Sequence, residues 1–125
     1  MDSRANYDIQ NNDGGTALMY AAEHGHADIV QRLLASGADP DIQNNYGNTA
    51  LICAAKKGND NIVQQLLASA AKPNLRNNND ATALSIAEGR GFFEIVELLQ
   101  IFSKKDDTLF HSSQDAAEAD EKQEP

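Results

Sequence analysis

The side chains that could carry out chemistry are three histidines, one cysteine and a pair of serines. The histidines are His24, His26 and His111, and none has cysteines or carboxylates at the spacing of metal ligands. His24 and His26 are two residues apart, a spacing that turns them to different sides of a helix end. Ser112 and Ser113 fall in a stretch expected to be coil. The sequence therefore predicts neither a metal site nor an activated serine.

The single cysteine, Cys53, lies in an apolar run over residues 50–55 and can form no disulfide within the chain. A nucleophilic thiol needs a nearby base and partial exposure, and neither is visible here. We expect Cys53 to be a small buried side chain. The glycines are spaced as turns between helices and not as a phosphate-binding loop. We therefore predict that the protein is not an enzyme and holds no cofactor.

The chain repeats itself every 33 residues. Four landmarks keep this spacing through three copies, which makes chance a poor explanation. They are Thr-Ala-Leu at 16–18, 49–51 and 82–84, glycine at 25, 58 and 91, Ile-Val at 29–30, 62–63 and 95–96, and leucine at 33, 66 and 99. Such a period indicates stacked supersecondary units, none of which buries its apolar face alone.

Each unit is predicted to be a helix, a tight turn, a second helix and an extended finger. In the first copy, the hydroxyl of Thr16 can cap a short helix that Gly25 ends. A second helix is predicted over residues 27–35, because its apolar residues recur on one face. The asparagine-rich finger at residues 44–47 predicts turns, since asparagine side chains bond to their own backbone there.

These units resemble the ankyrin repeat family. The resemblance rests on the following segments of the first copy and their equivalents: Gly14-Gly15-Thr16-Ala17-Leu18, Ala21-Ala22, Gly25-His26, Ile29-Val30, Leu33-Leu34 and Gly37-Ala38-Asp39. The family typically has Pro-Leu-His after the threonine, where this chain has Ala-Leu followed by Met, Ile or Ser. The resemblance implies an all-α repeat solenoid of stacked helix pairs with β-hairpin-like fingers.

The resemblance divides the chain into five parts. They are a partial finger of a preceding repeat at 1–10, ankyrin repeat 1 at 11–43, repeat 2 at 44–76, repeat 3 at 77–102, and an acidic tail at 103–125 that we expect to be disordered. In repeat 3, Glu88 and Gln100 stand where the earlier copies are apolar. Repeat 3 is therefore predicted to be a C-terminal cap whose outer side meets water.

The start of the array has no such cap. Only a finger precedes repeat 1, so the side of repeat 1 that faces backwards should expose Leu18 and Ile29. Two explanations are open: the chain is part of a longer ankyrin scaffold, or a partner or a second copy covers this face. A weak point is also expected in repeat 2, because Ala70 stands where repeat 1 has Gly37.

The resemblance further implies a protein–protein interaction module. Its binding face would consist of the finger tips and the outward, concave side of the first helices, and its partner would be another protein or peptide. Carried over position by position, this face comprises Asp13, Glu23, His24, Gln43, Tyr46, Asn48, Lys56, Lys57, Arg76, Asn79 and Arg90. The same positions include three small residues, Gly15, Ala81 and Gly89.

Four cations on this face, which we call the basic strip, suit an acidic peptide: Lys56, Lys57, Arg76 and Arg90. The alternative is that these cations stabilise helix C-termini, by about 0.3–1 kcal/mol each. Tyr46 is either an aromatic anchor for the partner or a side chain packed on the next finger.

The net charge of −9 is concentrated in the tail. Residues 1–105 carry 12 acidic and 9 basic residues, or −3, and residues 106–125 carry 7 and 1, or −6. This charge repels phosphates, so we expect no nucleic-acid binding. The longest apolar run is far shorter than the roughly 20 residues that cross a bilayer, and no signal peptide is visible. We expect a cytoplasmic protein, with the nucleus or secretion as an effector as alternatives.

Overall fold

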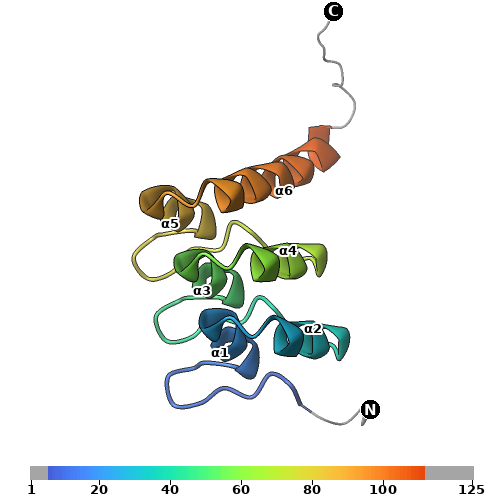
Figure 1. Cartoon of the computed structure of the whole chain (residues 1–125), viewed down its shortest axis with the longest axis vertical. Coiled ribbons are helices and arrows are strands. Elements are labelled where there is room, and N and C mark those ends of the chain that lie inside the picture. Colours follow the sequence, from blue (N-terminus) through green and yellow to red (C-terminus); the bar gives the residue numbers. More distant parts are fainter. Residues whose placement is uncertain (1–5, 112–125) are drawn as a thin grey trace, which may run out of the picture.

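Three helix pairs make up the array. The computed structural model describes the backbone of residues 6–111 and the side chains of residues 6–103. The helices are α1 (Ala17–His24), α2 (Ala27–Ala35), α3 (Ala50–Lys57), α4 (Asp60–Ala68), α5 (Ala83–Arg90) and α6 (Phe93–His111). The pairs are stacked one on the next, and a finger precedes each pair on one side of the stack (Figure 1). No strand occurs within residues 6–111, so turns build the fingers.

The first helix of each pair begins and ends as the sequence predicts. Thr16 has an extended backbone, and its hydroxyl accepts a hydrogen bond from the N–H of Met19. Thr49 and Thr82 cap α3 and α5 in the same way. Gly25 ends α1 with φ of 78°, a left-handed conformation that costs little only for glycine. These caps fix the length of the helices on which the predicted binding face lies.

One core runs through the whole stack, both within each helix pair and between neighbouring repeats. The helices α1, α3 and α5 contact one another in sequence and form one layer, and α2, α4 and α6 form the second layer (Figure 1). Repeat 2 is covered on both sides, so that Ile62, Val63 and Leu66 are almost fully buried. Burying one such side chain stabilises the fold by about 1.5–3 kcal/mol.

The C-terminal end of the stack is polar. Glu88 and Gln100 are exposed, whereas Ala55 and Leu67, their equivalents in repeat 2, are buried. Asp80 stands where the earlier fingers have glycine, and it has a left-handed backbone with φ of 64°. No further finger follows it within residues 6–111, and its carboxylate pairs with Arg76 of its own finger. The outer side of repeat 3 therefore suits contact with solvent.

The last helix is longer than predicted. We expected a tail from residue 103, but α6 continues to His111, so the predicted boundary is wrong for residues 103–111. Ser103 stands at the position of Gly37, and Asp106 at that of Pro40. The glycine and the proline that would stop a helix are thus both missing. The rest of the tail, residues 112–125, lies outside the described residues.

The N-terminal end of the stack is apolar, as expected, but not at every residue predicted. Ile29 is 44% exposed, whereas its equivalent Ile62 is 2% exposed. The expectation for Leu18 is wrong, since Leu18 is only 1% exposed. This side chain faces repeat 2 and not backwards, because its equivalent in the last repeat, Leu84, is the one left partly uncovered.

Replacing Ala70 by glycine is expected to raise the free energy of unfolding by about 1–2 kcal/mol. As predicted, Ala70 has a left-handed backbone, with φ of 68°. Its side chain is exposed, so the change removes no core contact. Urea unfolding measures the effect, with Ala68→Gly at the end of α4 as the matched control that should lower stability. A variant no more stable than the wild type contradicts the prediction.

Candidate interaction surface

Asparagine side chains hold each finger in shape. The Oδ1 atom of Asn44 accepts hydrogen bonds from the N–H groups of Tyr46, at 2.9 Å, and Asn48, at 3.0 Å. Asn11 and Asn77 do the same in the other two fingers. The turn chemistry predicted for the asparagines is therefore confirmed. Its effect is to fix the backbone that carries Tyr46 and Asn48.

Neighbouring fingers are also bonded to each other. The amide of Asn45 donates to the carbonyl of Asn12 at 3.1 Å, and the amide of Asn78 donates to the carbonyl of Asn45 at 2.8 Å. The backbone N–H of Asn45 donates to the carbonyl of Asp13 at 2.8 Å, and that of Asn78 to the carbonyl of Tyr46 at 2.9 Å. The finger tips thus form one continuous row.

Two residues predicted to bind a partner are engaged within the protein. The amide of Gln43 donates to the carbonyls of Gly47, at 2.8 Å, and Arg76, at 2.9 Å, so it joins two fingers. The guanidinium of Arg76 lies 3.4 Å from the carboxylate of Asp80 in an exposed pair. Such a pair contributes little to stability, but it offsets much of the positive charge at this end of the basic strip.

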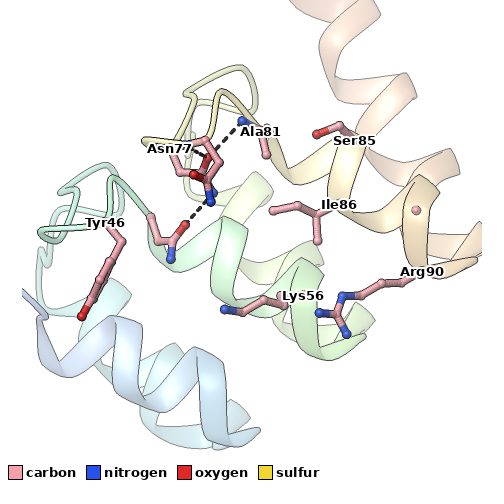
Figure 2. Close-up of a pocket in the computed structure, with 10 residues that line it drawn as sticks. Tyr46, Lys56, Asn77, Ala81, Ser85, Ile86 and Arg90 are labelled. Atoms are coloured by element: carbon pink, nitrogen blue, oxygen red, sulfur yellow. Dashed lines mark hydrogen bonds between the residues drawn. The ribbon is translucent and has the colours of Figure 1, made fainter.

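A hollow of about 610 Å³ lies between the second and third fingers and the helices α3 and α5. We call it the finger–helix pocket (Figure 2). Five of the predicted site residues line it: Tyr46, Asn48, Lys56, Asn79 and Arg90. The other lining residues are Asn77, Ala81, Ser85, Ile86 and Gly89. The prediction omitted Ser85 and Ile86, which lie one helical turn before Gly89 and Arg90 and therefore share their face.

The pocket combines positive charge with an aromatic wall. Lys56 and Arg90 both line the pocket below Ile86, and each extends toward the side where Tyr46 stands (Figure 2). Neither cation has an ion-pair partner among the described side chains. Tyr46 is 64% exposed, which favours an open anchor over packing against the next finger. The site can thus offer cations and apolar surface to the same ligand.

The remaining predicted residues lie outside this pocket. Asp13, Glu23, His24 and Lys57 are exposed but do not line it. The basic strip is therefore divided: two of its cations line the pocket, Lys57 lies apart, and Arg76 is paired.

The histidines of repeat 1 are closer together than their spacing predicts. The ring of Tyr20 stacks on that of His24 with centroids 4.1 Å apart, and His26 lies 6.3 Å from His24 with the rings nearly parallel. The prediction that His24 and His26 turn to different sides is therefore wrong. Gly25 reverses the chain between them with a left-handed backbone, and this turn brings the rings to one side. Sequence spacing alone assumes a continuous helix.

Cys53 is a structural residue. Its side chain is 4% exposed in α3, as the apolar run predicts. Burial raises the pKa of the thiol from 9.0 to about 11, and the carboxylate of Glu23 adds to this, while Lys56 and Lys57 lower it. The thiol is therefore protonated at neutral pH, and the thiolate needed for attack or metal binding is scarce.

Two further kinds of site were sought in the described part of the chain. Over these residues, no group of three or more His, Cys, Asp or Glu side chains could hold a metal ion. None of the helices described here combines the length and the apolar character needed to cross a bilayer.

Comparison with known proteins agrees with the stacked architecture. A family model described as ankyrin repeats (3 copies) matches residues 1–77 and 25–109. No curated protein matches the chain. The chain belongs to the ankyrin repeat family.

Proposed function

We propose that this protein binds an acidic segment of another protein in the finger–helix pocket, without catalysis. Ankyrin repeats are generally protein–protein interaction modules. The observation that carries the proposal is that Lys56 and Arg90, both without ion-pair partners among the described side chains, line the same hollow of an acidic protein. Such a local positive field attracts carboxylates and fixes their position.

The array serves this function by its rigidity. The two walls of the pocket belong to different repeats, and hydrogen bonds between the fingers fix their separation. A preformed site orders few of its own groups on binding, so less of the interaction energy is lost to conformational entropy. A protein that binds a partner without catalysis needs only such a preformed site with complementary shape and charge.

Selection from a phage-displayed library of random dodecapeptides tests the proposal. Peptides captured by the wild-type protein should be rich in Asp and Glu, and their affinity should fall several-fold between 50 and 500 mM NaCl, because salt screens exposed charges. Capture of basic or neutral peptides, or an affinity that does not change with salt, contradicts the proposal.

A second candidate function, self-association, is favoured by the N-terminal face of repeat 1. We define this face as Ala17, Tyr20 and Ile29, which are exposed, whereas the equivalent residues of repeat 2 are buried. Asp28 and Arg32 lie one turn apart on α2 and are also exposed. In a two-fold pair of antiparallel α2 helices, Asp28 of one copy lies opposite Arg32 of the other. We propose such a weak dimer as the alternative.

Light scattering at increasing concentration tests the dimer. We expect a dissociation constant of the order of 10–100 µM, since the apolar patch is small. Arg32→Asp should abolish association, because the facing charges become alike, and Asp28→Arg/Arg32→Asp should restore it. A monomer at all concentrations contradicts the dimer and leaves this face to another protein.

A further inference from the structure

Gly89 stands in a helix where the fold does not require glycine. It belongs to the last turn of α5, and its φ is not positive. A Cβ atom built there meets no atom of the protein within 4 Å. The equivalent residues in repeats 1 and 2 are Glu23 and Lys56, so the position tolerates a long side chain. Glycine weakens a helix relative to alanine, so the local structure gains nothing from it.

The place of Gly89 gives it a different role. It lines the finger–helix pocket, together with Ile86 on the same face of α5 and Ala81 at the end of the third finger. Its missing side chain leaves open space in the part of the pocket wall that α5 forms with Ile86 and Arg90. Repeat 2 fills the equivalent position with a lysine, so this opening is specific to repeat 3.

Polar groups around this opening remain available. The side-chain amide of Asn79 has no hydrogen-bond partner among the described residues, and the Nδ2 of Asn48 has none either. The hydroxyl of Ser85, in contrast, is engaged with Thr82. Two free amides on neighbouring fingers can hydrogen-bond the backbone of an extended segment, whose own N–H and C=O groups need partners when it is bound.

We infer that Gly89 keeps a subsite open for one large apolar side chain of the partner, next to a carboxylate held by Lys56 and Arg90. The partner is thus an extended protein segment in which an Asp or Glu lies within two residues of a Leu, Ile, Met, Phe, Tyr or Trp. Ile86 and Tyr46 supply the apolar walls, and the two cations supply the charge complementarity. This inference rests on the proposed function and specifies its ligand.

The test uses the tightest-binding dodecapeptide selected by the wild-type protein, labelled with fluorescein and titrated by fluorescence anisotropy. Gly89→Ala should weaken its binding about 5- to 20-fold, because the new methyl group occupies the subsite. The same change should raise the melting temperature by about 2–5 °C, since alanine is the better helix former. A higher melting temperature together with weaker peptide binding in Gly89→Ala would show that glycine at this position serves binding and not stability.

Two controls make this result specific. Ala70→Gly also stabilises the array but lies outside the pocket, so its affinity for the peptide should equal that of the wild type. A peptide whose apolar residue next to the acid is changed to alanine should bind the wild type more weakly. It should also lose most of its sensitivity to Gly89→Ala, because the two changes affect the same contact.

The possible failures are distinguishable. In one failure, the selected peptides bind Lys56→Glu/Arg90→Glu more weakly than the wild type but bind Gly89→Ala as tightly as the wild type. This result overturns the apolar subsite and leaves the acidic-peptide function standing. Selected acidic peptides without a large apolar residue near the acid overturn the subsite as well. A library that yields no peptide sensitive to Lys56→Glu/Arg90→Glu overturns both the subsite and the proposed function.

Discussion

Replacing Gly47 by alanine should lower the free energy of unfolding by about 3 kcal/mol or more. Two causes add up. Gly47 has φ of 79°, and a left-handed backbone costs an alanine about 1–2 kcal/mol. Its Cβ would also lie 2.7 Å from the backbone nitrogen and 2.7 Å from the Oδ1 of Asn78. This contact is too short, so the third finger must move and its bonds to the second finger must weaken.

The matched control for this change is Gly91→Ala. Gly91 has a similar φ of 75°, but a Cβ there meets nothing within 4 Å. Its replacement should therefore cost only the backbone part, about 1–2 kcal/mol. Urea unfolding of both variants measures the difference, which is the part due to the contact between fingers. Equal losses for the two variants would show that the fingers do not need this close approach.

Reversing both charges in the pocket, Lys56→Glu/Arg90→Glu, should weaken binding of a selected acidic peptide by 100-fold or more. A single close charge pair at a partly exposed interface contributes on the order of 1 kcal/mol. Reversal removes two attractions and adds two repulsions, so about 4 kcal/mol is lost, which corresponds to a factor of several hundred. Fluorescence anisotropy at 0.15 M salt measures the change.

The control for charge reversal keeps the same change in net charge outside the pocket. Lys57→Glu/Arg76→Glu alters the other half of the basic strip, where Lys57 lies apart and Arg76 is already paired with Asp80. We expect its affinity to fall less than about 5-fold, because neither side chain lines the pocket and exposed charges are weakened by solvent and salt. If the two double variants lose equal affinity, the ligand responds to the general field and not to the pocket.

Local features were predictable from the chain because each depends on a few neighbouring residues. The helix at residues 27–35 forms with these bounds in α2, since its apolar pattern and the flanking turns specify it. Ala70 has a left-handed backbone because it follows a helix in the way that Gly37 does. The prediction for residues 103–111 was wrong for a local reason as well, because the stop signals at Gly37 and Pro40 have no counterpart there.

The candidate site was predictable only in part. One pocket is lined by five of the predicted residues: Tyr46, Asn48, Lys56, Asn79 and Arg90. Equivalent positions in the repeats were not sufficient to predict this. Lys57 and Arg90 are equivalent by the 33-residue period, yet only Arg90 lines the hollow. Gly89 leaves a gap where repeat 2 has Lys56, and within residues 6–111 no further repeat covers α5, so the repeats are unequal.

The sequence by itself determined the period, the caps and turns of each unit, and the ankyrin family, because these depend on contacts between residues close along the chain. Only the tertiary structure decided which side chains are exposed and which are engaged in contacts within the protein. Stacking engages Gln43 in bonds between fingers, turns Leu18 into the core and leaves Ile29 exposed. It also brings Lys56 and Arg90, from successive repeats, to one hollow. The physical reason is that the rotation and spacing of one repeat on the next set these distances, and many weak contacts across each interface determine that geometry together.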